Sequence, residues 1–436
     1  MGNSEKLVGK YESADFKMKK KTYKINSFFA GIGGFDVAFE KQGFSTALLC
    51  EINPFCNQIL SRHWPDVQKA GDINSITESE IPDSDVWCGG FPCQDISVAR
   101  GASERLGLKG KRSGLFYRFA ELIEAKMPEV VIIENVAGLF TSNNGRDFGV
   151  ILQTLTSLGY AVAWRLLNSR YFGVPQSRTR VYLCCWKNNP AKALSVMFDK
   201  QGATKPENER IDFITEESKS DEYPKVPRVA YCLAASSGRH TGTDWSRTYV
   251  VCEEGVRRLS PVESERLQGF PDNWTSPSEE AILDENINTL RYTAIGNAVS
   301  VPVVEWIANK VKKQLDDKAY STPIDEVLSS YPDFQKSMWS DISLVDIDFS
   351  DTNKVYKWLR GGIAWASHYI ECNVSPTPSK IIKSSLLKLI ERNQTNSVYF
   401  LSPNAAEGIL RRVDSQNRSL FMPLRTALEK LSSRNN

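Results

Sequence analysis

The stretch Lys24–Phe35, of sequence Lys-Ile-Asn-Ser-Phe-Phe-Ala-Gly-Ile-Gly-Gly-Phe, carries the clearest indication of the fold. An apolar, strand-like run leads into Gly31, Gly33 and Gly34, and a helix-like pattern follows from Val37. A strand, a glycine turn and a helix in this order let a nucleotide-like ligand approach the backbone at the carboxyl end of the strand. A glycine turn by itself also occurs for purely structural reasons. Other segments must therefore decide whether this turn binds a ligand.

Short apolar runs alternate with helical periodicity over the rest of the first half of the chain. The runs are Thr46–Cys50, Val86–Cys88, Val130–Ile133 and Val181–Trp186, and helical patterns cover Phe116–Ala125 and Phe148–Leu158. Strands that alternate with helices favour a doubly wound, mostly parallel sheet with both faces covered. The sequence therefore predicts an α/β protein.

Two acids follow strands where a cofactor could meet them. Glu51 lies 20 residues after Gly31, the place where doubly wound nucleotide binders hold ribose hydroxyls. Asp72, in Gly71–Ile73, is suited to an adenine amino group. A lone acid after a strand is more often a helix cap or a turn residue. With the glycine turn, the two acids predict an adenosine-containing cofactor.

Two further segments supply reactive groups. Gly89–Ser97, of sequence Gly-Gly-Phe-Pro-Cys-Gln-Asp-Ile-Ser, holds Cys93 in a loop directly after a strand, as a nucleophile requires. Val130–Val136 ends in Glu134, a carboxylate that is costly to bury unless it is hydrogen-bonded or kept protonated. An inert loop thiol is the commoner reading of an isolated cysteine, but a thiolate and an acid at one sheet edge fit covalent catalysis.

Arginines at alternate positions mark the segment Pro175–Tyr182. Arg178 and Arg180 would point to the same face of a strand, where two guanidiniums suit a phosphate or a base carbonyl. Such a pair is more often a solvated edge when nothing surrounds it. Farther along, Ser260–Glu263 has the form of a helix-capping box with proline at the first helical position.

Composition and rare residues exclude several classes. The chain has 436 residues with 41% hydrophobic and 24% charged residues, typical of a globular protein of two to four domains, and a net charge of +2. It has no apolar run near the roughly 18 residues of a membrane span and no secretion-signal core, so we expect a cytoplasmic protein. Nine cysteines without a Cys-x-x-Cys pair and three histidines predict no disulfide framework, no metal site and no Cys-His or Ser-His-Asp hydrolase.

Six blocks occur together in an order that resembles the DNA (cytosine-5)-methyltransferases of restriction-modification type. They are Phe-Ala-Gly-Ile-Gly-Gly-Phe, Gly-Gly-Phe-Pro-Cys-Gln, Glu-Asn-Val, Gln-Ser-Arg-Thr-Arg, Arg-Leu-Ser-Pro-Val-Glu with Leu-Gln-Gly-Phe-Pro, and Gly-Asn-Ala-Val, between residues 23 and 304. The resemblance implies a Rossmann-like methyltransferase sheet and a small irregular β-containing target-recognition domain, with 23–186 and 276–318 as the catalytic domain and 187–275 as the recognition domain. Outside the family blocks, composition predicts a flexible basic tail at 1–22, and 319–436 is expected to be a mainly helical C-terminal extension without a readable role.

The resemblance also assigns residues. It implies S-adenosyl-L-methionine as cofactor, held by Phe29, Gly31, Gly33, Gly34, Glu51, Ile52, Asp72, Ile73, Pro92, Leu115, Asn297 and Val299. Cys93 resembles the nucleophile that adds to carbon 6 of cytosine, Glu134 the acid at nitrogen 3, and Arg178 with Arg180 the groups that hold the base. The target base must be flipped out of the duplex for this chemistry.

Recognition is expected in the variable segment 187–256, chiefly in Ser236–Arg247. Arg239 and Arg247 are candidates for guanine readout, although phosphate contact or solvation is as good a reading, and Gln94 and Ser97 are expected to contact DNA. The expected partner is double-stranded DNA, with a cognate restriction endonuclease as a functional partner, and the protein is expected to be a monomer. Two alternatives remain: a transfer-RNA methyltransferase on the same fold, and a catalytically silent DNA-binding regulator.

Overall fold

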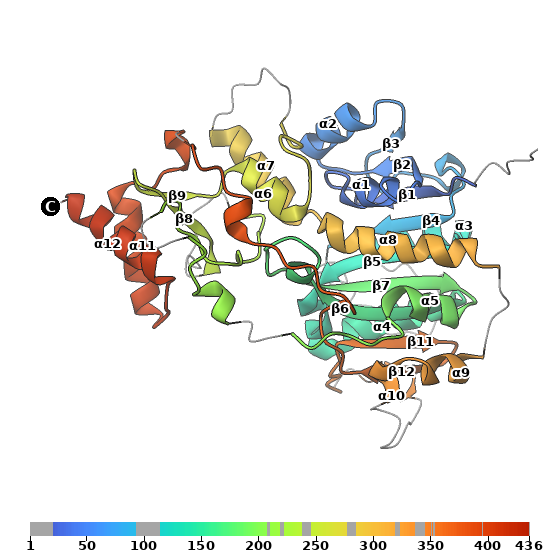
Figure 1. Ribbon diagram of the computed structural model, residues 1–436. Coiled ribbons are helices and arrows are strands. Elements are labelled where there is room, and N and C mark those ends of the chain that lie inside the picture. Colours follow the sequence, from blue (N-terminus) through green and yellow to red (C-terminus); the bar gives the residue numbers. More distant parts are fainter. Residues whose placement is uncertain are drawn as a thin grey trace, which may run out of the picture.

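The computed structural model describes residues 21–92, 114–206, 210–218, 222–237, 246–276, 285–318, 323–335, 345–349, 351, 354–394 and 396–435. Within them, a ten-stranded sheet forms a large lobe, and a two-stranded ribbon with helices forms a smaller lobe at the left of Figure 1. The strand order in the large sheet is β10-β12-β11-β6-β7-β5-β4-β1-β2-β3.

The first seven strands define the fold class. They are β1 (Lys24–Phe28), β2 (Ser45–Cys50), β3 (Gln68–Ala70), β4 (Val86–Gly89), β5 (Val130–Val136), β6 (Tyr160–Asn168) and β7 (Thr179–Lys187). β1 to β5 run parallel to one another, whereas β7 pairs antiparallel with both β5 and β6. The predicted doubly wound α/β fold is therefore confirmed, and the carboxyl ends of β1, β4 and β5 meet at one edge.

Helices cover both faces of this sheet. α1 (Gly34–Glu40), α2 (Pro54–His63), α5 (Pro190–Met197) and α8 (Val301–Asp316) contribute to one hydrophobic core, and α3 (Leu115–Lys126) and α4 (Arg146–Ser157) to the other. The alternation of β5 divides its side chains between them, with Ile132 in the first core and Ile133 in the second. Burial on both faces explains why the strand sequences are continuous apolar runs.

The smaller lobe is built on β8 (Tyr249–Val251) and β9 (Val256–Arg258), followed by α6 (Pro261–Gln268) and α7 (Glu285–Asn297). α6 begins with the expected capping box: the Ser260 hydroxyl accepts from the Glu263 N–H at 3.1 Å, and the Glu263 carboxylate accepts from the Ser260 N–H at 2.7 Å. Gly269, with φ of 85°, ends the helix. The start and end of α6 thus follow directly from its sequence.

The C-terminal segment divides between the two lobes. β11 (Gly361–Trp365), β12 (His368–Cys372) and β10 (Val345–Asp346) extend the large sheet in antiparallel fashion from β6, next to the short helices α9 (Ile324–Ser329) and α10 (Pro332–Gln335). α11 (Pro403–Ser415) and α12 (Met422–Ser432) pack on β8 and β9, forming a third hydrophobic core (Figure 1). The expected C-terminal helices are present, and the three strands are an addition that the sequence patterns did not indicate.

Candidate functional site

The glycine turn after β1 has an open side and a closed side. Gly31 and Gly33 have φ of 57° and 80°, a left-handed backbone that glycine adopts without strain. A Cβ on Gly33 would overlap the Trp64 ring, whereas a Cβ on Gly31 would meet none of the described atoms within 4 Å. The turn is therefore packed against α2 at Gly33 and has room for a ligand at Gly31.

Glu51 is fixed to this turn from the end of β2. Its Oε2 accepts from the Gly31 N–H at 2.7 Å, and its Oε1 accepts from the Asn53 N–H at 2.7 Å. Asn53 in turn caps α2 by accepting from the Cys56 N–H at 3.1 Å. Beside it, Ile52 is 68% exposed and offers an apolar surface at the sheet edge. The acid and the apolar side chain stand together where a ribose and a ring could bind.

The other residues predicted for the cofactor approach the same edge. Phe29, Ile73 and Leu115 belong to one hydrophobic cluster, and the Phe29 ring stands edge-on to Phe119 at 6.0 Å. Asp72 Oδ1 accepts from the backbone and the side-chain N–H groups of Asn74, each at 2.9 Å. The carboxylate is thereby held at the end of β3 with its other oxygen not used in those bonds.

The Gly-Asn-Ala-Val block, the last of the six blocks in the sequence, packs against the glycine turn, which belongs to the first block. Val299 is buried, and a Cβ on Gly34 would lie 2.6 Å from its Cγ2. Asn297, the last residue of α7, is exposed. Trp274 supports the turn as well, because its Nε1–H donates to the Ile32 carbonyl at 2.9 Å. No sequence pattern indicated this last contact, which joins residues 242 positions apart.

Glu134 lies at the carboxyl end of β5, where its side chain is buried. Burial raises the pKa of Glu134 above its ordinary value, and the positive charges of Arg180 and Arg178 oppose that rise. Arg180 Nε lies 3.2 Å from Glu134 Oε1, an oxygen that has no hydrogen-bond partner among the described residues. A buried acid with a raised pKa and an oxygen available for a further hydrogen bond is suited to protonate, or to bond, a ligand nitrogen.

The loop after β4 is bonded to Asn135, the residue that follows this acid. The Asn135 side-chain N–H donates to the Phe91 carbonyl at 3.0 Å, and a Cβ on Gly90 would lie 3.3 Å from the Glu134 carbonyl oxygen. Pro92 is exposed at the end of this described stretch. Cys93, Gln94 and Ser97 lie outside the described residues, as does Arg239.

The two arginines of Pro175–Tyr182 have different surroundings. Arg178 is 3% exposed and donates to the carbonyls of Leu233, Gly296 and Ala298 at 3.0, 3.1 and 2.8 Å, so it joins the start of β7 to two distant segments. Arg180 is directed at Glu134. The sequence predicted that both arginines lie on the same face of the strand. Their residue type could not reveal that backbone carbonyls surround the guanidinium of Arg178.

Gln176 is a further residue of this region that sequence reasoning missed. It is fully buried, its Nε2–H donates to the Leu267 carbonyl at 3.0 Å, and its Oε1 accepts from the Leu233 N–H at 2.9 Å. Its amide thus holds the loop at 230–234 against the end of α6. Its position inside the Gln-Ser-Arg-Thr-Arg block was the only available signal.

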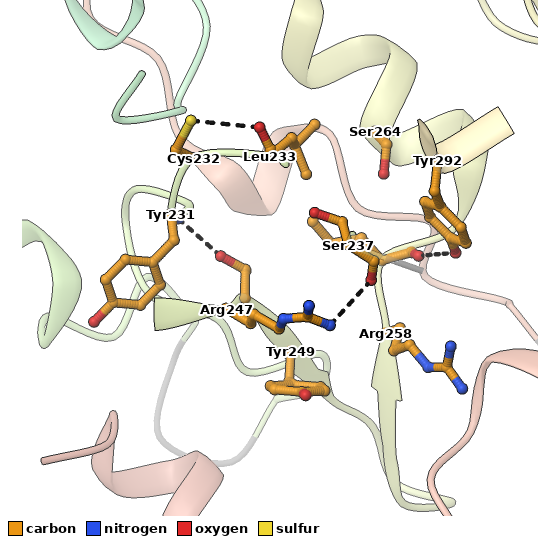
Figure 2. Close-up of a pocket in the computed structure, with 11 residues that line it drawn as sticks. Tyr231, Cys232, Leu233, Ser237, Arg247, Tyr249, Arg258, Ser264 and Tyr292 are labelled. Atoms are coloured by element: carbon orange, nitrogen blue, oxygen red, sulfur yellow. Dashed lines mark hydrogen bonds between the residues drawn. The ribbon is translucent and has the colours of Figure 1, made fainter. Parts of the chain in front are cut away.

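A pocket of the smaller lobe contains the predicted recognition residue Arg247 (Figure 2). The Arg247 guanidinium donates to the Ser236 carbonyl at 2.7 Å and lies 3.5 Å from the Ser237 carbonyl. Tyr249, Arg258 and other residues complete the lining. Arg247 therefore supports the backbone at 236–237, at the beginning of the segment where recognition was expected.

Neither a membrane-spanning helix nor a cluster of metal ligands occurs in the described part of the chain. None of its helices is both long and apolar enough to cross a membrane. Within the same residues, no group of three or more His, Cys, Asp or Glu side chains is placed to hold a metal ion. The eight described cysteines carry free thiols.

The fold and the sheet edge at the carboxyl ends of β1, β4 and β5 define the class of protein. It is a doubly wound α/β enzyme architecture, in which ligands bind in a crevice at the carboxyl ends of parallel strands. The family model for C-5 cytosine-specific DNA methylases matches residues 23–247 and 203–313. The chain therefore belongs to the C-5 cytosine-specific DNA methylase family and is a DNA (cytosine-5)-methyltransferase. The resemblance read from the sequence is confirmed.

Individual relatives agree with the family match. Type II methyltransferase M.NgoBI of Neisseria gonorrhoeae is 32% identical over 303 residues, which are 65% of this chain and 91% of that protein. M1.ScrFI of Lactococcus lactis subsp. cremoris is 32% identical over 334 residues, 70% of this chain and 82% of that protein. Among solved structures, the Entamoeba histolytica methyltransferase EhMeth gives a TM-score of 0.48 at 18% identity, over 68% of this chain and 100% of that one.

Proposed function

We propose that this enzyme transfers a methyl group from S-adenosyl-L-methionine to carbon 5 of a cytosine flipped out of a specific duplex DNA sequence, through a covalent adduct with Cys93. The observation that carries the proposal is the pair Glu134–Arg180 at the end of β5. The next residue, Asn135, donates a hydrogen bond to the loop that leads into Cys93, and β4 alone separates β5 from the strand that carries the glycine turn. One crevice thus combines a base site with a nucleotide site.

The cofactor proposal rests on how the edge is built. The open side of Gly31, the Glu51 carboxylate and the exposed Ile52 fit an adenosine moiety, and Asp72 with Ile73 fits its base. We assign Phe29, Gly33, Gly34, Pro92, Leu115, Asn297 and Val299 to the same site. When bound, S-adenosyl-L-methionine supplies an electrophilic methyl group on a sulfonium.

The residues of this chain would make the cytosine reactive. The Cys93 thiolate forms a bond to carbon 6, while Glu134 gives a proton or hydrogen bond to nitrogen 3, and electron density moves to carbon 5. Carbon 5 then takes the methyl group, its proton leaves to a base, and the bond between Cys93 and carbon 6 breaks. Arg180 orients Glu134 and the base, and we infer that Arg178 acts by holding the backbone around them.

Target recognition is proposed for residues 187–275, with 23–186 and 276–318 as the catalytic domain. Flipping the base costs a few kcal/mol, which contacts to the opened duplex must offset. Gln94, Ser97 and Arg239 are proposed to supply such contacts. Arg247 is proposed to act in recognition through the backbone that it supports at Ser236 and Ser237.

The biological role that we propose is protection of cytoplasmic DNA from a cognate restriction endonuclease, by a monomeric enzyme. The relatives M.NgoBI and M1.ScrFI are named type II methyltransferases, which supports this role. Incubation with tritiated cofactor and either plasmid DNA or transfer RNA tests the substrate. We expect label in DNA that is lost with Cys93→Ala; label in transfer RNA alone would replace DNA as the substrate, and label in neither would support a silent DNA-binding protein.

A further inference from the structure

The segment at 373–401, which we call the strap, joins the two lobes outside the part of the chain that the family model matches. It leaves β12, the second strand from one end of the large sheet, and crosses to α11 on the smaller lobe (Figure 1). At the large lobe, the Asn168 N–H donates to the Pro376 carbonyl at 3.0 Å. Ile382 exchanges hydrogen bonds of 3.0 Å with Tyr171 and Gly173, in the connection between β6 and β7. The strap is therefore attached beside the strand that carries Arg180.

At the smaller lobe, the strap reaches the first turn of α6 through Glu391. The Ser260 hydroxyl donates to Glu391 Oε2 at 2.6 Å, and the Glu391 N–H donates to Glu263 Oε1 at 2.8 Å. Arg257 Nη2 donates to the Glu391 carbonyl at 3.0 Å. One strap residue thus contacts three side chains at the N-terminus of α6.

These contacts add hydrogen bonds to a buried ion pair. Arg257 and Glu263 form two hydrogen bonds of 2.8 Å, and both side chains are 0% exposed. A buried pair of this kind is favourable only when its remaining donors and acceptors are also satisfied. Glu391 satisfies one on each partner, by its N–H to Glu263 and its carbonyl to Arg257.

The other end of α6 is bonded to the catalytic edge. Gln268 Nε2 donates to the carbonyls of Ile295 and Ala298 at 2.9 and 3.2 Å, and Gln268 Oε1 accepts from Gln176 Nε2 at 3.2 Å. The Ala298 carbonyl also accepts from Arg178 Nη2 at 2.8 Å. α6 therefore spans from the strap contact at its start to the residues around the target-base site at its end.

We propose that Glu391 is a positioning residue for target recognition: by fixing the first turn of α6 to the strap, it sets the placement of the recognition region relative to Arg180 and Glu134. The proposal rests on the proposed function, since it concerns how that site selects its DNA. The side chain of Glu391 makes one of these contacts, the bond from the Ser260 hydroxyl, and its backbone makes the other two. When the side-chain bond is lost, productive binding of the target sequence becomes rarer, while the cofactor side of the crevice, on β1 to β3, is unaffected.

The variants Glu391→Ala and Glu391→Gln, in the full chain, test this role. Gln can still accept from the Ser260 hydroxyl, so it separates the loss of that bond from the loss of charge. Glu407→Ala is the matched control, because Glu407 is an exposed glutamate of the same C-terminal segment, on α11. The readouts are methyl-transfer rates on plasmid DNA, cofactor affinity by calorimetry, and bisulfite sequencing of DNA from a host without other cytosine methylation.

We expect Glu391→Ala to raise KM for DNA about tenfold, the effect of about 1.4 kcal/mol, and to increase methylation at near-cognate sequences severalfold. The kcat at saturating DNA and the cofactor affinity should stay within about twofold, and Glu391→Gln and Glu407→Ala should resemble the native enzyme. An unchanged KM and site profile with only a lower Tm, or an equal loss of cofactor affinity, would overturn the proposal. Absence of methyl transfer by the native enzyme would instead refute the proposed function.

Discussion

Gly31 and Gly362 show how differently two regions of this protein use the same residue type. At Gly31, in the turn after β1, an added Cβ would meet none of the described atoms within 4 Å, so the position is kept open at the sheet edge. At Gly362, in β11, a Cβ would overlap the Trp164 ring and the Ile370 carbonyl. The first glycine leaves room for a ligand, and the second lets two strands and a tryptophan pack closely.

The difference extends to the regions around them. The glycine-turn edge presents side chains such as Glu51 and Ile52 that retain accessible surface, which is where chemistry and binding are expected. The C-terminal segment acts mostly by burying backbone and side chains of the lobes it touches. Changes at the edge should therefore alter activity with little loss of stability. Changes to the buried contacts of the C-terminal segment should mainly lower stability, with Glu391, which contacts the first turn of α6, as the exception.

The largest effect is expected for Cys93→Ala. Loss of the nucleophile should reduce methyl transfer by at least about 10³-fold, because no covalent activation of carbon 6 remains. Tm and the affinities for DNA and cofactor should change little. Rates on plasmid DNA, with thermal unfolding as control, measure both; a variant that keeps substantial activity would break the assignment of chemistry to this edge.

Removal of residues 319–436 should destroy the folded state. Arg165 is fully buried in β6, and its guanidinium donates to the carbonyls of Ser375 and Thr377 in the strap, so truncation would leave a buried charge with fewer partners and expose the β6 edge. Breaking a buried charge interaction alone costs about 3–5 kcal/mol, a large part of a typical stability of about 5–15 kcal/mol. Solubility and circular dichroism check this; a soluble, active truncated enzyme would contradict it.

A pH-dependent effect is expected from Asp36 in α1, directly behind the glycine turn. Burial raises its pKa from 3.8 to about 7, although Ser27 and Thr46 donate to its Oδ1. The folded state therefore holds the Asp36 proton up to a higher pH than the unfolded state does. As pH rises from about 4 towards 7, the free energy of unfolding falls, because the unfolded chain releases this proton first. A difference of one bound proton changes the free energy of unfolding by about 1.4 kcal/mol per pH unit. The protein should therefore lose about 2–3 kcal/mol of stability between pH 5 and 7.

The Asp36→Asn protein should lack this slope. Urea unfolding of the native protein, Asp36→Asn and the exposed control Asp66→Asn at several pH values measures it. If the free energy of unfolding depends on pH in the same way for the native protein and Asp36→Asn, the buried acid does not lower stability as pH rises, and the prediction is wrong.

The smallest effect is expected for Asp72→Ala. Loss of one hydrogen bond from the cofactor to a charged acceptor should weaken its binding about tenfold. This factor corresponds to about 1.4 kcal/mol, close to the lower end of the about 1.5–3 kcal/mol that such bonds contribute. Calorimetry with S-adenosyl-L-methionine measures the affinity, with Asp66→Ala as the control. Equal affinities for the two variants would remove Asp72 from the proposed site.

The sequence was most informative where local pattern and chemistry coincide. The glycine turn, the capping box of α6 and the placement of Glu134 at a strand end all follow from spacing and residue type, and the structure has them as expected. The partners of Arg178 and Glu391 could not be read in this way, because each bonds to backbone or side chains more than 50 positions away. The hairpin of β11 and β12 was not predicted either, because its turn has no glycine. Ala366 takes the left-handed φ of 49° there instead.

The most direct test of the central claim is covalent trapping. Duplex DNA in which 5-fluorocytosine replaces cytosine at the methylated position cannot lose the carbon 5 substituent as a proton, so the adduct at Cys93 should persist after methyl transfer. We predict a denaturation-resistant complex of enzyme and DNA that requires S-adenosyl-L-methionine and is absent for Cys93→Ala. No complex with the native enzyme, or an equal yield with Cys93→Ala, would contradict the account.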